Sequence, residues 1–217
     1  MTSLDDKIKA QYSSRDQSGD LYDSDYSKLA DEERLKTMKE MLGSVSHDST
    51  IIEIGAGQGG NVPMLEACGF KTGHIFLNEL LPDRIKMAEE RFPQLKMYPG
   101  NVLDIDFKKQ FDFVFQSTVF TSILDDSDRK KVAEKMWQML KPGGSILWYD
   151  FVYNNPLNRN VRKVSLHELK TLFPDSVKTT VRRVTLAPPI GRRVGKLYKV
   201  FNVPFLRTHI FAVIHKS

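Results

Sequence analysis

The sequence has little that would fit an exported or membrane-spanning protein. A single cysteine, Cys68, excludes an internal disulfide, and its place in an apolar helical segment predicts a buried, unreactive thiol. No segment approaches the ~20 consecutive apolar residues that a membrane-spanning helix needs. The N-terminal residues 1–6 are polar and acidic, unlike a secretory signal. We therefore expect a cytoplasmic protein.

Acidic residues are almost missing from the C-terminal part of the chain. Residues 156–217 hold 13 lysines and arginines but only Glu168 and Asp175 as acids, although the whole chain carries a net charge of only +5. Such an excess can be a solvated basic face, or it can attract a polyanion, a phosphate-bearing substrate or a membrane surface. Both interpretations stay open, and peripheral membrane contact is one form of the second.

Strand and helix patterns alternate along the chain, which predicts a mostly parallel sheet with helices on both faces. The length of 217 residues and the 41% hydrophobic content suit one such domain. The predicted strands are 50–54, 74–78, 96–99, 111–116, 144–149, 177–186 and 207–215. The predicted helices are 27–42, 61–69, 82–92, 127–140 and 165–173, with a short one near 190–200.

A glycine-rich turn follows the first predicted strand. The run Ile51–Ile54 is apolar and β-branched, as in a buried parallel strand, and Gly55, Gly57 and Gly60 come directly after it. Such a turn lets backbone lie against a nucleotide-like cofactor at a helix N-terminus. The spacing also satisfies the dinucleotide pattern G-x-G-x-x-G, so the turn alone does not identify the cofactor.

An acidic residue, Glu79, ends the second predicted strand, 24 residues after Gly55. At that spacing a carboxylate can accept hydrogen bonds from both ribose hydroxyls of a bound nucleoside. It would repel a 2′-phosphate, which argues against NADP.

Three further segments make a resemblance specific: G-N-V-L-D at 100–104, F-D-F-V-F-Q at 111–116, and L-K-P-G-G at 140–144. Together with the glycine turn and Glu79, they resemble the class I S-adenosylmethionine-dependent methyltransferases. The resemblance implies a Rossmann-like α/β fold, with a seven-stranded, mostly parallel sheet and an antiparallel last strand. It implies one domain over 1–217, with a flexible arm (1–26), a cofactor-binding core (27–151), and acceptor-side cap elements and last strands (152–206).

A narrower resemblance points to a bacterial group of small methyltransferases associated with glycan and lipid-linked polysaccharide gene clusters. It rests on the segments 117–123, 148–151, 154–156, 172–174 and 186–189. A small-molecule or glycan-type acceptor is the implied partner, with an anionic group on it left open. The oligomeric state is unknown.

The resemblance also implies a set of residues for S-adenosylmethionine and its product S-adenosylhomocysteine. The backbone of the turn would approach the methionyl part, Glu79 would hold the ribose, and Asn101 with the Val102 amide would face the adenine. Gln116 would lie near the methionyl end, and Glu53 either touches the cofactor or braces its own turn. The residues expected to bind the cofactor are Glu53, Gly55, Ala56, Gly57, Gln58, Glu79, Asn101, Val102 and Gln116.

Methyl transfer is an in-line displacement, so much of the catalysis can come from aligning the acceptor. A hydroxyl acceptor also gains from a base. Asp150 ends the fifth predicted strand, and His167 opens a helix in which Ser165 and Glu168 predict a capping box. Both are candidate bases. We expect no metal site.

The leading hypothesis is O-methylation of a small or glycan-type acceptor. An RNA methyltransferase is an alternative that the basic C-terminal part permits, although no N-P-P-Y-type motif follows residue 116. A non-catalytic cofactor-binding regulator is a second alternative, because a fold does not fix an activity. A nicotinamide dehydrogenase is disfavoured by L-K-P-G-G and by the lack of a second catalytic domain in the sequence.

Overall fold

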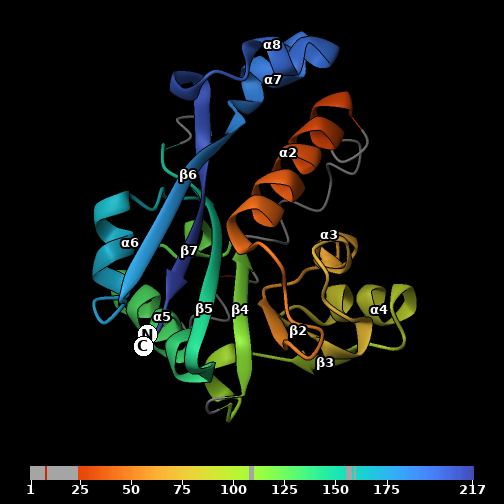
Figure 1. Ribbon diagram of the computed structural model, residues 1–217, viewed down its shortest axis with the longest axis vertical. Helices are drawn as coiled ribbons and strands as arrows, with labels where there is room; N and C mark the ends of the chain where they lie inside the picture. The colour runs from red at the N-terminus through yellow and green to blue at the C-terminus, as the bar shows by residue number, and fades with distance from the viewer. Residues whose placement is uncertain (1–7, 9–23, 108–109, 155–157, 159) are drawn as a thin grey trace.

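The computed structural model describes residues 8, 24–107, 110–154, 158 and 160–217 (Figure 1). Most of the predicted arm over 1–26 lies outside the described residues, as do Asn155 and Pro156. The part of that arm from Asp25 on is helical, because Ser24 caps a helix by accepting a hydrogen bond from the Ser27 amide. The helix therefore begins two residues before its predicted start at residue 27.

Seven strands form one sheet in the order β3-β2-β1-β4-β5-β7-β6. In chain order they are β1 (Ile51–Ile54), β2 (Ile75–Glu79), β3 (Lys96–Pro99), β4 (Phe111–Ser117), β5 (Leu140–Phe151), β6 (Lys178–Leu186) and β7 (Arg207–His215). Strands β1 to β5 pair in parallel, whereas β7 runs antiparallel to both β5 and β6. The predicted fold class, including the antiparallel last strand, is confirmed.

Helices cover both faces of the sheet (Figure 1). The described α-helices are α2 (Asp25–Leu42), α3 (Val62–Ala67), α4 (Pro82–Arg91), α5 (Asp126–Met139), α6 (Leu166–Leu172), α7 (Pro188–Val194) and α8 (Tyr198–Phe201). Side chains of α2 and α3 pack with Phe115, Leu147 and Tyr149 on one face, and those of α5 and α6 pack with Trp148 on the other. Successive β5 residues therefore point to opposite faces, as the two-residue period of a strand requires.

Strand β5 differs from the prediction because it begins at Leu140 instead of 144. Leu140 pairs with Phe111, and the register then shifts before Ser145 pairs with Phe113. Gly143 has a φ of 76° within this irregularity, a left-handed conformation that glycine adopts without strain. The L-K-P-G-G segment is thus a bulge within the strand and not a turn before it.

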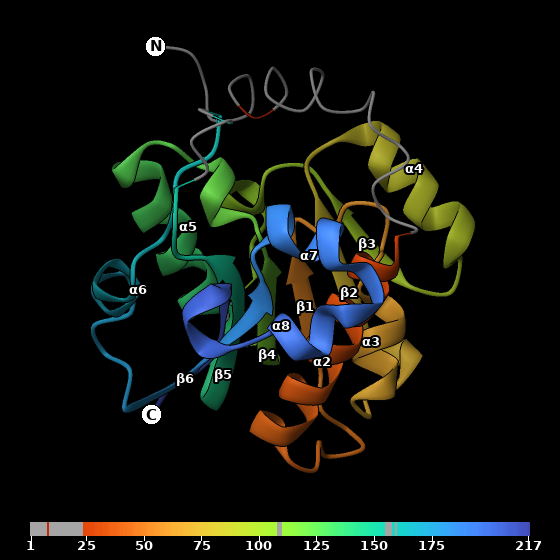
Figure 2. The ribbon, with the colours of Figure 1, turned by 90° about the horizontal axis from the view of Figure 1, so that it is seen from above.

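A compact excursion separates β6 from β7, and we call residues 188–206 the cap. It contains α7, the 3-10 turn η5 (Gly195–Leu197), α8 and the 3-10 turn η6 (Pro204–Leu206), where the sequence predicts one short helix. Because β6 runs parallel to β5, the cap leaves the sheet at the carboxyl edge of the parallel strands. Figure 2 looks down on this edge, with α7 and α8 in front of the strands.

Candidate functional site

The turn after β1 has the backbone conformation that its glycines predict. Gly55, Gly57 and Gly59 have φ values of 68°, 58° and 73°. A Cβ atom on Gly55 would lie 2.6 Å from Cγ2 of Val119, which comes from the loop after β4. Gly55 itself is exposed. The turn therefore presents bare backbone at the carboxyl edge of the sheet, a cradle that a side chain would fill.

Glu79 lies beside this turn and is bound by it. One carboxylate oxygen accepts from the Gly57 amide at 2.7 Å, and the other accepts from the amides of Leu80 and Leu81 at 2.9 Å each. A carboxylate has about four acceptor positions, so these three bonds leave about one for a ligand. Contact with both ribose hydroxyls would require one amide to yield, and the predicted ribose contact remains a prediction.

Glu53 lies fully buried beneath the turn and forms a chain of contacts with Asn61 and Arg34. Asn61 donates its amide to one oxygen of Glu53 and accepts from the guanidinium of Arg34. The second oxygen of Glu53 has no hydrogen-bond partner within the described part of the chain. Burial raises the pKa of Glu53 from 4.5 to about 7, against the lowering effects of Asn61 and Arg34. An unsatisfied buried oxygen under a glycine cradle fits a site that receives a polar or cationic ligand group.

The remaining predicted cofactor residues are placed around the same edge. Ala56 donates its amide to Asn78 O at 2.9 Å, and the carbonyl of Gln58 accepts from Arg91 at 3.1 Å. Asn101 caps a 3-10 turn, η3 (Val102–Asp104), by accepting from the Leu103 amide at 2.9 Å. Val102 is buried in the core.

Gln116 is fully buried at the end of β4, and both ends of its side-chain amide are engaged by backbone. It accepts from the Val119 amide at 3.0 Å and donates to Tyr149 O at 3.3 Å. These bonds fix the loop that carries Val119 over Gly55. The predicted contact of Gln116 with the methionyl end is untested, and the observed contacts give the residue a positioning role.

Asp150 is fully buried on the α5 and α6 face. Its oxygens accept from the Phe151 amide at 3.0 Å and from the Thr121 amide at 3.3 Å. Burial raises the pKa of Asp150 from 3.8 to about 7. Action as a base would require these contacts to open, so the role that the sequence predicts for Asp150 stays a prediction.

His167 is exposed in the first turn of α6, and no hydrogen bond joins it to Asp150 among the described residues. Ser165 caps this helix by accepting from the Glu168 amide at 3.1 Å. The predicted capping box is only half formed, because the Glu168 carboxylate pairs with Arg129 and Arg162 instead. Arg129 is fully buried, so it requires that counter-charge more than the helix end does.

A second group at the carboxyl edge was not predicted from the sequence. The guanidinium carbon of Arg34 lies 4.8 Å above the Tyr149 ring, and the His209 ring stacks on Tyr149 with a centroid separation of 5.0 Å and an interplanar angle of 10°. The Tyr149 hydroxyl lies 2.8 Å from that of Thr185. We call Arg34, Tyr149 and His209 the Tyr149 stack.

The groups of the Tyr149 stack have defined charges near neutral pH. Burial, helped by the charge of Arg34, lowers the pKa of His209 from 6.5 to about 4, so its imidazole is neutral. Burial raises the pKa of Tyr149 to about 12, so its hydroxyl keeps its proton. Nε of Arg34 is buried and lacks a hydrogen-bond partner in the described residues. The stack therefore offers one cation, one neutral base and one hydroxyl donor.

Two threonines beside the Tyr149 stack have backbone conformations that threonine rarely adopts. Thr118 has a φ of 59° and Thr185 a φ of 64°, both left-handed. Thr118 donates its amide to Tyr149 O at 2.8 Å, and Thr185 contacts the Tyr149 hydroxyl. Strain of this kind persists only where surrounding contacts impose it, and it is concentrated at functional sites.

Two further aromatic residues near the end of β5, Trp148 and Tyr153, differ in their surroundings. Trp148 is fully buried between Phe120 and Phe173 and belongs to the core. Tyr153 is exposed, and its hydroxyl accepts from Arg183 at 2.6 Å. Only Tyr153 is accessible to an acceptor.

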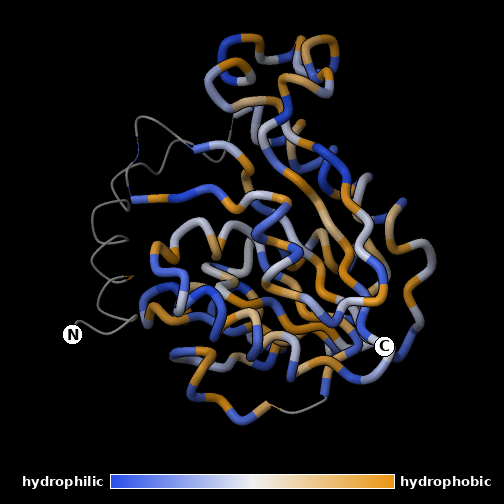
Figure 3. The backbone as a smooth tube through the Cα atoms, turned by 90° about the vertical axis from the view of Figure 1, so that its left-hand side faces the viewer, coloured by the Kyte–Doolittle hydropathy of each residue, from blue (hydrophilic) through white to orange (hydrophobic). Residues whose placement is uncertain are grey.

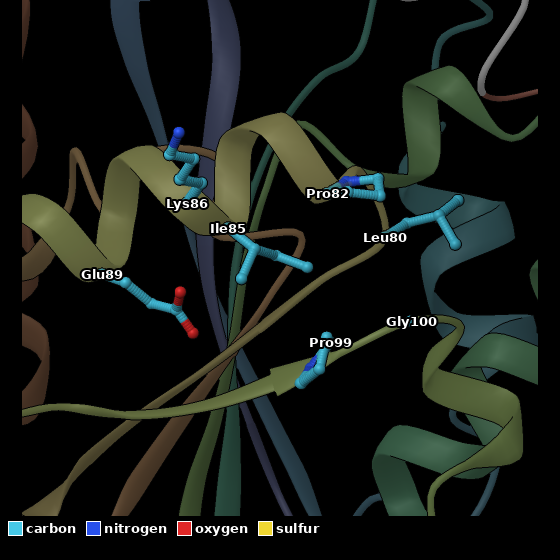
Figure 4. A pocket seen from close by; sticks show the side chains of 7 residues that line it. All are labelled: Leu80, Pro82, Ile85, Lys86, Glu89, Pro99 and Gly100. Carbon is cyan, nitrogen blue, oxygen red and sulfur yellow. The ribbon is translucent and has the colours of Figure 1, made fainter.

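A hollow of about 440 Å³ lies between α4 and the end of β3 (Figure 4). Ile85 from α4 and Pro99 from β3 point into the space between helix and strand, and Leu80 and Gly100 also line it. These last two residues adjoin Glu79 and Asn101 in the chain. No residue of the Gly55–Gly59 turn is among the described residues that line it. The hollow lies beside the predicted ribose and adenine contacts, not over the turn.

Comparisons with known proteins agree with this geometry. Residues 51–144 match the family model described as "Methyltransferase domain". The glycine/sarcosine/dimethylglycine N-methyltransferase of Actinopolyspora halophila is 29% identical over 132 residues, which are 58% of this chain and 23% of that protein. The chain thus spans about a quarter of the length of this curated relative.

Solved methyltransferases share the fold at low identity. A SAM-dependent methyltransferase from Thermotoga maritima superposes with a TM-score of 0.66 at 14% identity, over 99% of this chain and 100% of that one. The phosphoethanolamine N-methyltransferase 1 of Haemonchus contortus, in complex with phosphoethanolamine and S-adenosylhomocysteine, gives 0.61 at 13% identity over 100% and 50%. These structures and the sheet order show that the chain has the class I methyltransferase fold, and the match over residues 51–144 identifies a methyltransferase domain within it.

Proposed function

We propose that this protein transfers a methyl group from S-adenosylmethionine to a hydroxyl of a small or glycan-type acceptor. When bound, the cofactor supplies an electrophilic methyl group on a sulfonium. The Gly55–Gly59 backbone would cradle the methionyl part, and the free acceptor position of Glu79 would take a ribose hydroxyl. Arg34 would meet the methionyl carboxylate through the donor that lacks a partner. The unsatisfied oxygen of Glu53 would face positive charge.

The observation that carries the choice of a hydroxyl is the Tyr149 stack. Attack by a hydroxyl gains from a group that takes its proton, and such a group is worth about 10²–10⁴ in rate. His209 is neutral and half-buried at the carboxyl edge, so its lone pair is available, but burial and Arg34 weaken it as a base. It would take the proton once a carboxylate of the bound cofactor or an anionic acceptor offsets the charge of Arg34. We assign this role to His209, with Tyr149 fixing its ring plane. Tyr153 and Arg183 on the neighbouring rim suit a hydroxyl-rich or anionic acceptor.

Methyl transfer to an amine is the second candidate. It is favoured by the relative from Actinopolyspora halophila, whose name specifies N-methylation. A neutral amine attacks through its own lone pair, so His209 would then only shape the pocket. A cytoplasmic location is proposed on the sequence alone. Among the described residues, no helix is both long and apolar enough to cross a membrane.

The test combines cofactor labelled in its methyl group with fractionated cell extract and two histidine variants. We expect label in a glycan or small hydroxylated fraction, with His209→Asn lowering kcat about 100-fold or more and leaving cofactor affinity unchanged. His215→Asn is the matched control, because His215 lies at the far end of β7 and bonds to Ser145. Its activity should equal that of the wild type.

The outcomes separate the candidates. Label in an amine, with His209→Asn active, would replace the hydroxyl acceptor by an amine. Label in RNA would overturn both. Cofactor binding without transfer to any fraction would support a non-catalytic regulator.

A further inference from the structure

The outer surface of the cap is apolar to an extent that no other described surface approaches. Phe205 is 79% exposed, Val200 70%, Leu197 57% and Phe201 41%. These four residues lie within nine positions of one another in the chain. Figure 3 shows the hydrophobic and hydrophilic stretches of this lobe at the top of the view, away from the body of the protein.

The inner side of the cap packs firmly against the rest of the protein. The exposure of its outer apolar side chains is therefore not a result of loose packing. Tyr198 is fully buried, donates its hydroxyl to Glu33 at 2.6 Å and accepts from the Leu186 amide at 3.2 Å. Gly191 approaches the Tyr26 ring so closely that a Cβ atom would lie 2.2 Å from it. The cap thus presents its exposed side chains from a fixed base on α2.

Exposed cations occur in the same segment as these apolar side chains. Arg192, Arg193, Lys196 and Lys199 are all exposed on the cap, and residues 176–217 contain no acidic residue. Lys199 lies 3.8 Å from Glu32 of α2, and both side chains are largely exposed. Exposed apolar side chains on one small element that also carries exposed lysines and arginines have the chemistry of a surface that inserts into the head-group region of an anionic bilayer.

We propose that the cap docks on an anionic membrane surface, with its four apolar side chains in the interface and its cations on lipid phosphates. Two of the four are aliphatic and offer no ring for a nucleic-acid base to stack on. Four cations on each copy would oppose a symmetric contact between two copies of the chain. Charge complementarity therefore favours an anionic bilayer over RNA or self-association.

Docking of the cap does not depend on which atom is methylated, but it would fix the orientation of the site relative to the membrane. The cap leaves the sheet at the same edge that carries the glycine turn and the Tyr149 stack. Docking would bring that edge toward the lipid head groups. An acceptor anchored in the membrane would then be supplied at the surface, without leaving the bilayer.

The experiment is co-sedimentation of the full-length chain with vesicles at low salt. One set contains phosphatidylcholine alone, and the other contains equal parts of phosphatidylcholine and phosphatidylglycerol. We expect binding to the anionic vesicles at least ten-fold tighter than to the neutral ones. Phe205→Ser should weaken it about ten-fold. Arg193→Gln with Lys196→Gln should weaken it about 25-fold, since each cation near such a surface contributes about five-fold.

Matched controls test whether the location of the change matters. Val177→Ser removes an apolar side chain that is also well exposed, but it precedes β6, away from the cap. Lys130→Gln removes an exposed cation on α5. Neither should change vesicle binding. Far-ultraviolet circular dichroism of every variant separates loss of docking from loss of fold.

The proposal would be overturned by no binding to anionic vesicles, or by equal binding to both vesicle types. Equal losses of vesicle binding in the control variants and the cap variants would also overturn it. So would binding of single-stranded RNA that the cap variants abolish, if the same variants still bind vesicles. Dimerisation in sedimentation equilibrium that Phe205→Ser abolishes, without vesicle binding, would assign the cap to a second copy. Because none of these measurements uses methyl transfer, their failure is distinguishable from failure of the proposed activity.

Discussion

Replacing Glu53 with glutamine should raise the free energy of unfolding at alkaline pH and should change it little near pH 4. Burial raises the pKa of this carboxyl from 4.5 to about 7. Below about pH 4 both the folded and the unfolded chain hold the proton, so the carboxyl costs no stability. As pH rises past 4.5 the unfolded chain releases its proton first. Stability is therefore lost through about pH 7 and then levels off.

The size of the effect follows from the gap between these two values. At 1.36 kcal/mol per pKa unit, the gap corresponds to at most about 3 kcal/mol of unfolding free energy. Glutamine stays neutral at every pH, keeps the shape of the side chain and can still accept from Asn61. Glu53→Gln should thus exceed the wild type by up to about 3 kcal/mol above pH 8 and match it near pH 4.

Urea unfolding at several pH values measures this difference, with the fluorescence of the buried Trp148 as the probe. Asp150 also has a raised pKa, but it is present in both proteins and cancels in the comparison. Glu90→Gln, on the exposed face of α4, is the matched control and should show no such gain. A difference that does not depend on pH, or a loss of stability in alkali, would refute the reasoning.

Three further predictions concern the turn and the α5–α6 contact. Glu79→Ala should weaken cofactor binding by about 1.5–3 kcal/mol in titration calorimetry; unchanged affinity with a collapsed melting temperature would make Glu79 purely structural. Gly55→Ala should cost at least about 1–2 kcal/mol in urea unfolding from its backbone alone, and adding Val119→Ala should recover only the part due to the clash. Arg129→Met should cost about 3–5 kcal/mol, because the carbonyls of Ile123, Arg162 and Lys163 lose a buried donor and Glu168 keeps only Arg162; a loss near zero in thermal melting would show that these groups find water instead.

The sheet was predictable because its signals are local. Strands β3 and β7 have the predicted bounds, β4 starts at the predicted residue, and the starts of β1, β2 and β6 differ by one residue. The start of β5 was missed because a bulge continues the strand through a Pro-Gly-Gly sequence that reads as a turn. Propensity describes a residue and its neighbours, whereas the register shift depends on Phe111, about thirty residues earlier.

The site was only partly predictable for the same reason. The glycine turn and Glu79 are visible in sequence because their spacing is set within one strand-turn-helix unit. Arg34 and His209 both contact the Tyr149 ring only because α2 packs on the sheet face to which β5 and its neighbour β7 direct these two side chains. Nothing near Arg34 in the chain distinguishes it from the other charged residues of an ordinary helix.

The two left-handed threonines give Tyr149 an unusual mechanical situation. The Thr118 amide binds the main-chain carbonyl of Tyr149, and the Thr185 side chain contacts the Tyr149 hydroxyl, so two residues with strained backbones hold the main chain and the ring of this tyrosine. Each left-handed threonine costs folding free energy that a glycine would spare. A glycine in either position would let the main chain relax. The Tyr149 ring would then be less fixed and would no longer orient Arg34 and His209. Substitutions that stabilise the backbone at these two threonines should therefore lower activity.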